Sequence, residues 1–278
     1  MTIDPAQTLY NKVHATLKKS KYRPKGMIVR QPMYIWNSLR TTPYRMAGAP
    51  DGFPIPSSKL LISVNGTPDV RWFLQTGYLA AQSMVLAVKS SSLNIKNYKS
   101  ILDFGCGCGR VTRHLSFLKN SQLYGTDYNP TLIKWCQENL THARFQTNQL
   151  TPPLSYEENK FDLIYAFSVF THLPEPLQFS WRNEILRILK PSGILVMSTN
   201  GEYYFRDLSP TEQTQFRKGK LVTRGSNVAG SNFCNTYHST QYVRETFGEN
   251  FIILNFVPEG AKGNPYQDLF VLKKIKHS

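Results

Sequence analysis

The sequence lacks any long apolar run. No apolar stretch approaches the roughly 18 residues that a membrane-spanning helix needs, and residues 1–12 are mostly polar. A secretory signal would place an apolar core near the start of the chain. We therefore expect a cytoplasmic, soluble protein with no membrane span.

Cysteine is also scarce, with 4 residues in a chain of 278. Cys106 and Cys108 stand close together, whereas Cys136 and Cys234 stand alone. This spacing indicates neither a disulfide framework nor a paired metal site. A reactive or zinc-binding pair is the alternative, but it would need two further ligands that the sequence does not offer. We expect no metal, and we interpret Cys106 and Cys108 as small residues of a loop.

Acidic residues are few: 18 Asp and Glu stand against 33 Lys and Arg, for a formal net charge of +15. Residues 1–58 hold nine of the basic residues and two aspartates, and repeated prolines there break any long helix. This composition predicts a basic arm. Clustered basic residues bind nucleic acid, but short runs such as residues 18–21 are usually solvated surface, and no stacking pattern accompanies them. Nucleic acid is therefore the less favoured partner.

The most informative segment is residues 101–109, which read Ile-Leu-Asp-Phe-Gly-Cys-Gly-Cys-Gly. An apolar strand ends in a carboxylate, glycines follow at alternate positions, and a helix is expected from Arg110. Glycines let the backbone approach a ligand closely, and the first N–H groups of a helix attract an anion. A dinucleotide-binding loop would read Gly-x-Gly-x-x-Gly, whereas here the third glycine comes one residue early and Asp103 precedes the loop. That carboxylate would repel a pyrophosphate and suits the ammonium group of a bound amino acid.

The next motifs continue the alternation of strands and helices. A strand over residues 121–127 ends in Asp127, whose carboxylate offers two oxygens to the two hydroxyls of a ribose. Asn129 and Pro130 then begin a helix. A short strand from residue 143 ends in two amides, Asn148 and Gln149, which are placed to read the edge of an adenine.

The rest of the chain completes the pattern. Residues 161–170 form a nearly continuous apolar run, as expected of a central parallel strand. A helix follows over 175–189, a Leu-Lys-Pro-x-Gly turn ends it, and a strand is expected over 194–198. A later helix near 239–247 and strands near 251–257 and 268–275 close the sequence.

With these motifs, residues 95–275 resemble a class I S-adenosylmethionine-dependent methyltransferase. The resemblance implies an α/β fold with a Rossmann-like, seven-stranded, mostly parallel sheet, a final antiparallel strand and helices on both faces. It also implies S-adenosyl-L-methionine as the cofactor. The expected cofactor-binding residues are Asp103, Gly105, Cys106, Gly107, Asp127, Tyr128, Asn148, Gln149 and Ser168.

The resemblance also suggests how an acceptor is covered. Residues 67–69 predict the start of a helix that reaches about residue 88, carries Trp72 and covers the cofactor cleft. The connection 201–238 is expected to act as a lid insertion within a methyltransferase core of residues 95–278, which leaves residues 1–94 as the basic arm and cleft-covering helix. The expected acceptor-binding residues are Trp72, Tyr203 and His238. Clustered aromatics such as Tyr203 and its neighbours are also explained by local packing.

Methyl transfer from a sulfonium demands little of side chains, because aligning the acceptor and excluding water account for most of the catalysis. A hydroxyl acceptor still needs a base. His172 follows the fourth strand, where sites on parallel sheets form, and is the expected catalytic residue. A structural hydrogen bond to the following helix is the alternative for His172. His238 is a second candidate base, although it also stands where a helix cap would be.

These observations predict transfer of a methyl group to an oxygen or nitrogen of a small molecule, such as a sugar or a natural-product intermediate. One alternative is a methyltransferase for RNA or another macromolecule. Another is a cofactor-binding scaffold without turnover, which the intact Asp103, Gly105, Gly107 and Asp127 make the weaker reading. The sequence leaves the oligomeric state open.

Overall fold

The structure of the protein is a computed structural model that describes residues 44, 46 and 48–276. The basic arm expected over residues 1–58 lies mostly outside the described residues. Within the described part, no helix combines the length and the apolar character needed to cross a membrane.

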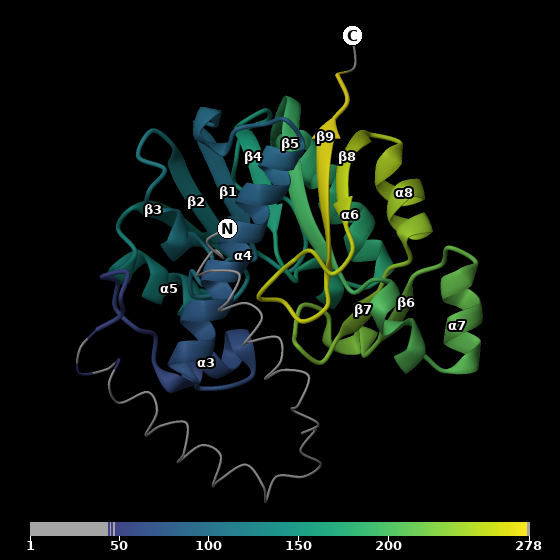
Figure 1. Cartoon of the computed structure of the whole chain (residues 1–278), viewed down its shortest axis with the longest axis horizontal. Helices are drawn as coiled ribbons and strands as arrows, with labels where there is room; N and C mark the ends of the chain where they lie inside the picture. The colour runs from purple at the N-terminus through teal and green to yellow at the C-terminus, as the bar shows by residue number, and fades with distance from the viewer. Residues whose placement is uncertain (1–43, 45, 47, 277–278) are drawn as a thin grey trace, which may run out of the picture. The chain divides into compact units, whose positions relative to one another are not determined.

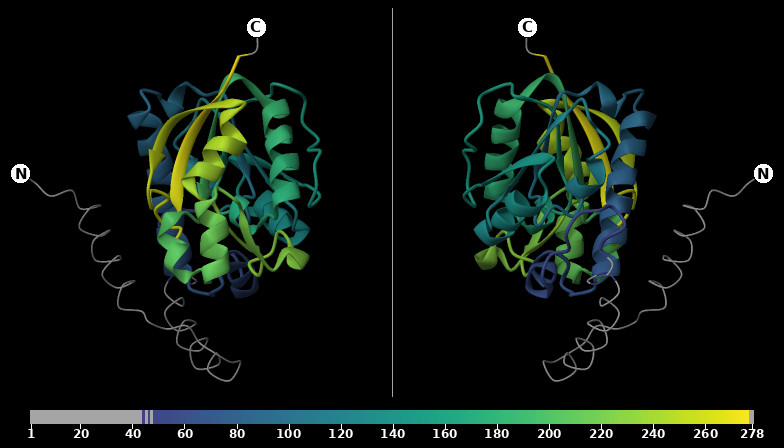
Figure 2. Two further views of the ribbon diagram at one scale, coloured as in Figure 1. Left: turned by 90° about the vertical axis from the view of Figure 1, so that its right-hand side faces the viewer. Right: turned by 90° about the vertical axis from the view of Figure 1, so that its left-hand side faces the viewer.

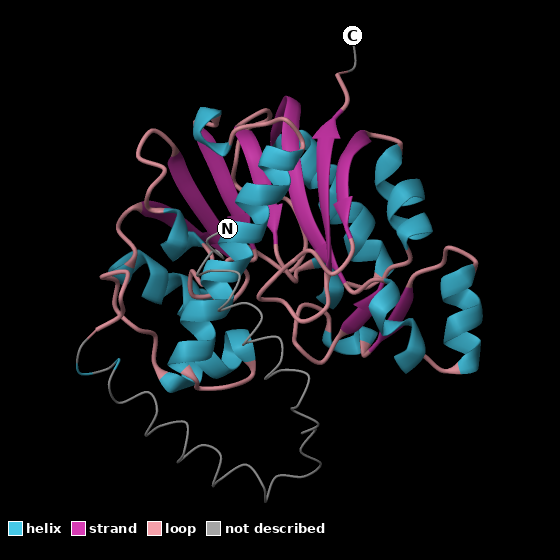
Figure 3. Cartoon of the chain, viewed as in Figure 1, coloured by secondary structure: helices cyan, strands magenta, loops and turns pink. Residues whose placement is uncertain are grey.

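A seven-stranded sheet forms the centre of the described residues (Figures 1 and 3). The strand order is β3-β2-β1-β4-β5-β9-β8, with parallel pairing from β3 to β5 and β9 antiparallel to both of its neighbours. The strands of this sheet are β1 (Ser100–Phe104), β2 (Gln122–Asp127), β3 (Ala143–Thr147), β4 (Phe161–Ala166), β5 (Leu189–Thr199), β8 (Phe251–Val257) and β9 (Asp268–Lys274). The expected Rossmann-like α/β fold with one antiparallel strand is confirmed.

Helices cover both faces of the sheet (Figure 2). On one face, Met84 and Val88 of α4 (Val70–Ser90) share a core cluster with side chains from β1, β4, β5 and β9. On the other face, Trp181 of α6 (Glu175–Ile188) and Phe247 of α8 (Thr240–Gly248) belong to a second cluster. β1 lies between these two layers and is buried along its whole length, which fits the apolar residues Ile101 and Leu102 before Asp103.

Capping side chains fix where two of the helices begin. The Asp69 carboxylate accepts a hydrogen bond from the Trp72 backbone N–H at 3.1 Å, so α4 begins just after the Thr-Pro-Asp motif. The Asn129 side chain caps α5 (Pro130–Asn139) in the same way, with proline as the first helical residue, as the sequence predicts. The remaining α-helices with described bounds are α3 (Ser58–Asn65) and α7 (Pro210–Arg217).

The helix expected from Arg110 is wrong. Only a short 3-10 segment, η3 (Thr112–Leu115), follows the glycine loop. Helix α4 packs directly on this part of the chain, because a Cβ on Gly77 would lie 2.1 Å from the Arg110 carbonyl oxygen. The fully buried Arg113 side chain is held by residues 51–54. Tertiary contacts therefore override the helical pattern after the glycines.

The expected turn at residues 190–193 is also different. β5 begins at Leu189, which pairs with Phe161, and the register shifts before Ile194 pairs with Leu163. The Lys-Pro-Ser-Gly segment is therefore an irregularity within a strand, and Ser192 adopts a φ of 63° there.

Residues 201–238 fold beside the carboxyl ends of the parallel strands (Figure 1). They contain the 3-10 segment η5 (Glu202–Asp207), helix α7, and a two-stranded sheet of β6 (Val222–Arg224) and β7 (Asn235–Tyr237). The Asn200 backbone carbonyl accepts a hydrogen bond from the His238 N–H at 2.8 Å. This contact joins the two ends of the insertion to the end of β5.

Candidate active site

The glycine loop between β1 and η3 is bonded to the end of β2. The N–H groups of Gly105 and Cys106 donate to the Thr126 carbonyl at 2.8 and 2.9 Å, and the Gly107 N–H donates to Oδ2 of Asp127 at 2.9 Å. Gly105 and Gly107 have φ values of 76° and 56°, which favour glycine. The loop therefore brings the backbone beside the two acidic strand ends.

The side-chain directions of these glycines face other parts of the protein. A Cβ on Gly105 would lie 2.4 Å from Cγ2 of Val169, and one on Gly107 would lie 2.9 Å from Cγ2 of Val64. Val64 belongs to α3, so α3 lies against the glycine loop, whereas α4 packs along the face of the sheet. The glycines allow close packing of the protein on one side of the loop, in addition to the expected approach of a ligand.

Asp103, at the carboxyl end of β1, is 3% exposed. Its Oδ2 accepts a hydrogen bond from the Thr112 hydroxyl at 2.5 Å, and no basic side chain in the described residues forms an ion pair with it. Burial raises the pKa of Asp103 to about 7, although the bond from Thr112 opposes the shift. A cationic group placed beside this carboxylate would be strongly favoured.

Asp127, at the carboxyl end of β2, is 9% exposed. Each oxygen accepts one backbone hydrogen bond, from Gly107 and from Asn129, both at 2.9 Å. Burial raises its pKa, and the two backbone N–H groups oppose that shift. Each carboxylate oxygen has a second lone pair, so the carboxylate is held in a fixed orientation and can still accept from two adjacent hydroxyls.

The other expected cofactor residues lie around this carboxylate. The Asn148 N–H donates to the Asp127 carbonyl at 3.1 Å, while Oδ1 of Asn148 is buried and has no partner in the described part of the chain. Gln149 is exposed, and Tyr128 is 42% exposed. Cys106 is buried below the loop, and burial raises the pKa of its thiol.

Ser168, just after β4, adopts a φ of 58° and anchors a polar network. Its N–H donates to the Ser198 hydroxyl at 2.8 Å, and its own hydroxyl accepts from Nε2 of Gln267 at 2.9 Å and lies 3.1 Å from the Thr171 hydroxyl. The Ser198 hydroxyl in turn donates to Oε1 of Gln267. Reasoning from the sequence missed Ser198 and Gln267, because β5 and the loop before β9 meet only in the folded chain.

Several known proteins are similar to this chain across the same elements. A family described as "Methyltransferase domain" matches residues 102–197. Tocopherol O-methyltransferase of Arabidopsis thaliana is 26% identical over 169 residues, which cover 58% of this chain and 45% of that protein. Sterol 24-C-methyltransferase ERG6A of Gibberella zeae is 28% identical over 152 residues, which cover 51% of this chain and 37% of that protein. The chain thus spans less than half the length of these two relatives.

A solved structure shares the fold: an S-adenosylmethionine-dependent methyltransferase from Mesorhizobium loti has a TM-score of 0.53 and 15% sequence identity, over 69% of this chain and 98% of that chain. The chain contains a class I methyltransferase domain. The cofactor of this class is S-adenosylmethionine.

The residues of the methyltransferase domain fit that cofactor. S-adenosylmethionine has an ammonium group, a carboxylate and a ribose diol. Asp103 is a buried carboxylate that has the hydroxyls of Thr112 and Tyr165 beside it but no ion pair in the described residues, which suits the ammonium group. Asp127 is oriented by backbone bonds and suits the diol. These pairings stay predictions for the individual residues, and the structure places the two carboxylates at the ends of two neighbouring parallel strands, beside one glycine loop.

On the acceptor side of the methyltransferase domain, His172 lies in the 3-10 segment η4 (Phe170–His172) after β4. Nδ1 of His172 lies 2.7 Å from the Cys234 carbonyl, which can only accept, so Nδ1 carries the proton. Nε2 has no hydrogen-bond partner in the portion of the chain that the structure describes. Burial lowers the pKa of His172. The imidazole is therefore neutral near pH 7, with a free basic nitrogen of fixed orientation.

The lid insertion of the methyltransferase domain approaches His172 directly. The Gly230 N–H donates to the His172 carbonyl at 2.8 Å, and the Asn232 amide donates to the Ser63 carbonyl of α3 at 3.1 Å. The segment 230–234 therefore joins α3 to η4. Its closing role stays a prediction, and these contacts agree with it.

The expected acceptor-binding residues stand on three different elements, with Trp72 in α4, Tyr203 in η5 and His238 just after β7. His238 is 1% exposed, and its Nε2 lies 3.0 Å from Oε1 of Gln178, so it is packed between the insertion and α6. Tyr203 stacks on Tyr266 with ring centroids 3.8 Å apart. Trp72 is half-buried in the first turn of α4. Contact of these residues with an acceptor stays a prediction.

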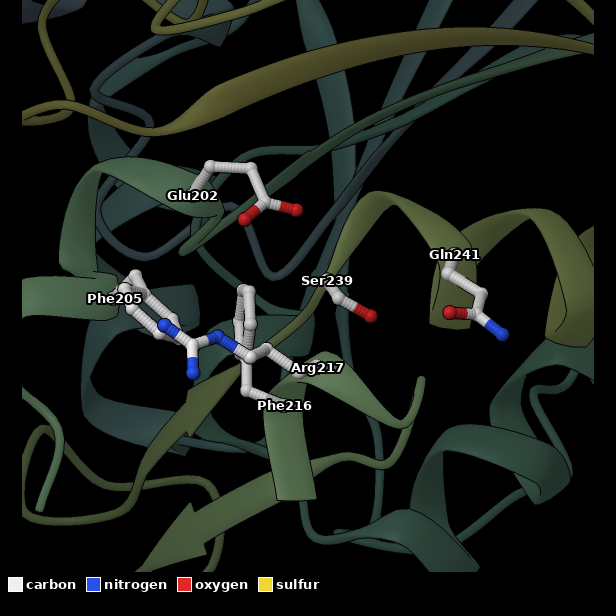
Figure 4. Close-up of a pocket in the computed structure, with 6 residues that line it drawn as sticks. All are labelled: Glu202, Phe205, Phe216, Arg217, Ser239 and Gln241. Carbon is white, nitrogen blue, oxygen red and sulfur yellow. The ribbon is translucent and has the colours of Figure 1, made fainter. Parts of the chain in front are cut away.

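A pocket of about 250 Å³ opens elsewhere in the insertion, between η5, α7 and the start of α8 (Figure 4). Its lining residues are Glu202, Phe205, Phe216, Arg217, Ser239 and Gln241. None of the expected site residues lines it. The pocket is therefore separate from the residues that surround the glycine loop.

Proposed function

We propose that the protein transfers a methyl group from S-adenosylmethionine to an oxygen or nitrogen of a small molecule. The observation that carries the proposal is the pair of buried carboxylates, Asp103 and Asp127, at the ends of neighbouring strands beside a glycine loop in a methyltransferase domain. A buried carboxylate without a counter-ion is costly for a fold to keep. Its presence supports retained cofactor binding and weighs against a scaffold that has lost it.

The bound cofactor supplies an electrophilic methyl group on a sulfonium. The chain itself orients and desolvates the reactants: Asp127 holds the ribose, Asp103 holds the amino group, and the segment 230–234 excludes water beside η4. Nε2 of His172 is the candidate acceptor of a proton from a hydroxyl, because its tautomer is fixed by the Cys234 carbonyl.

Two features support a small-molecule acceptor. Two relatives are named for tocopherol and a sterol, both small molecules. The base candidate His172 is half-buried behind the insertion, which suits an acceptor that enters a covered site. A methyltransferase for RNA or another macromolecule is the second candidate, favoured only by the net charge of +15.

Calorimetry with S-adenosylhomocysteine tests the cofactor part of the proposal. Asp127→Ala should weaken binding by roughly 1.5 to 3 kcal/mol, because a charge-assisted partner of two buried hydroxyls is lost. A folded variant with unchanged affinity would contradict the assignment of Asp127. Radiolabelled S-adenosylmethionine offered with a metabolite panel and an RNA panel tests the acceptor class, and methylation of RNA alone would favour the second candidate.

A further inference from the structure

Arg110, the residue after the glycine loop, carries a buried charge that the described part of the protein satisfies only partly. It is 9% exposed. Nη2 of Arg110 donates to Oδ1 of Asn264 at 2.7 Å, whereas Nη1 is buried and has no partner among the described residues. Native proteins rarely leave a buried donor of a charged group unpaired, so a missing acceptor is indicated at Nη1 of Arg110.

Asn264 shows the same deficiency. It is 6% exposed, and its Nδ2 amide is buried without a partner in the described residues. The orientation of the amide is fixed by Arg110, because a flipped Asn264 would place its NH2 group against guanidinium donors. One hydrogen bond thus joins two side chains, and each of them has an unused donor.

Arg110 lies near Asp103, because it stands two residues before Thr112, whose hydroxyl donates to Oδ2 of Asp103. Burial raises the pKa of Asp103, and the positive charge of Arg110 opposes that shift. No ion pair joins Arg110 to any acid of the described chain. A buried carboxylate and a buried cluster of donors therefore stand near each other, and each lacks a counter-charge in direct contact. An α-amino acid group, with an ammonium and a carboxylate, has the matching arrangement of charges.

The absence of a long helix after the glycine loop explains why side-chain donors, from Arg110 and Asn264, would be needed to bind an anion there. A long helix at this place would offer its N-terminal N–H groups to an anion, but η3 has four residues and cannot provide such a site. Asn264 comes instead from the loop between β8 and β9. That loop packs tightly on α4, since a Cβ on Gly263 would lie 2.1 Å from the Thr76 carbonyl oxygen.

We propose that Nη1 of Arg110 and Nδ2 of Asn264 bind the carboxylate of the cofactor's amino acid end, beside the ammonium group at Asp103. This assignment rests on the proposed function. It makes Arg110 and Asn264 specificity residues for a cofactor that carries a free α-carboxylate.

Two ligands separate this role from general loss of binding. S-adenosylhomocysteine has the carboxylate, and S-adenosyl-3-thiopropylamine is the same molecule without it. The wild-type protein should bind the first more tightly by calorimetry. Arg110→Met should weaken the binding of S-adenosylhomocysteine roughly 10- to 100-fold. The affinity of the variant for the amine should stay within about threefold of the wild-type value or increase, because a charge that repels the ammonium group is gone.

Asn264→Asp is the second variant, since it keeps the fold-stabilising contact with Arg110 and places a negative charge at the proposed site. It should weaken the binding of S-adenosylhomocysteine at least tenfold and leave the affinity for the amine unchanged. Arg182→Met is the matched control, because Nη1 of Arg182 donates to the Thr246 carbonyl at 2.6 Å, between α6 and α8. It should change neither affinity.

The assignment would be overturned if folded Arg110→Met and Asn264→Asp proteins lost affinity for both ligands equally, or for neither. Either result would leave the proposed function in place. A wild-type protein that binds both ligands equally would also overturn it. A wild-type protein that binds neither ligand would overturn the proposed function and this assignment together.

Discussion

Asp103 is a buried acid whose protonation should depend on what binds beside it. Burial raises its pKa from 3.8 to about 7, with the Thr112 hydroxyl opposing the shift. The folded protein therefore keeps a proton that the unfolded chain releases near pH 4, so this residue lowers the free energy of unfolding as pH rises from about 4 to about 7. Urea unfolding of wild type and Asp103→Asn should show the variant gaining stability relative to wild type over that range.

Cofactor binding should favour the ionised form of Asp103, because only a carboxylate pairs with an ammonium group. We expect the affinity for S-adenosylhomocysteine to stay constant just above pH 7 and to fall by up to about tenfold per pH unit below it, as a proton must be released. Asp103→Asn should bind weakly with little pH dependence between about pH 5.5 and 7. Calorimetry in buffers of different ionisation enthalpy would measure the proton release, and a flat wild-type profile would contradict the role.

His172 is a second residue whose contribution can be isolated. His172→Asn removes the basic Nε2, so single-turnover methylation of a hydroxyl acceptor should slow by about 10² or more. Affinity for S-adenosylhomocysteine should not change. Because burial lowers the pKa of His172, the wild-type rate should hold at neutral pH and fall only below pH 6.5, where the base becomes protonated. Near-normal turnover of the variant would show that His172 is not the base and has only a structural role.

Among the elements, η3 links the sheet to an entry strap, which we define as residues 49–57. Arg113 of η3 has a fully buried side chain and donates to both carboxylate oxygens of Asp51, at 2.5 and 2.8 Å. It also donates to the carbonyls of Phe53 and Pro54. The strap leads into α3, whose Val64 lies against Gly107. One arginine therefore positions the helix that borders the glycine loop.

Removing that arginine should loosen the strap. Arg113→Met leaves Asp51 and two carbonyls without their donor, and we expect a loss of about 3 kcal/mol in the free energy of unfolding, since breaking one side of a buried pair costs about 3–5 kcal/mol and Asp51 keeps some contact with water. Urea unfolding measures this loss, and limited proteolysis should cut the variant first within residues 49–57. Burial tends to raise the pKa of Asp51, but Arg113 brings it below 3.8, so the pair should stabilise the fold above about pH 4 and weaken below it. Unchanged stability and protection would contradict the link.

At the scale of the whole molecule, the net charge of +15 is the strongest unexplained feature. A protein that neutralises several phosphates loses affinity steeply as salt rises. A small neutral acceptor makes no such contacts, so its interaction with the site depends little on screening.

We therefore expect the acceptor KM of the full chain to change by less than about threefold between about 50 and 200 mM salt. Affinity for S-adenosylhomocysteine, measured in parallel, serves as the control for effects on the cofactor site. A loss of acceptor affinity of about 10³ or more over this range, with cofactor affinity unchanged, would favour a nucleic-acid acceptor.

The sequence by itself determined the order of strands and helices and the position of the glycine loop. Alternating apolar runs, caps such as Asn129 and glycines at fixed spacing are local signals, because burial on two faces and backbone conformation act within a few residues. For this reason β1, β2, α5 and the antiparallel β9 lie close to where the pattern predicts them.

Only the tertiary structure decided how distant segments complete the surroundings of that loop. Because α4 and the strap pack against the chain after Gly109, it forms the short segment η3 and not the expected helix. Arg110 meets Asn264 across 154 residues of sequence, and His172 meets Cys234 across 62. Such hydrogen bonds follow no periodicity, since they depend on where the folded chain returns to the same place, and one sequence read alone holds no signal for them.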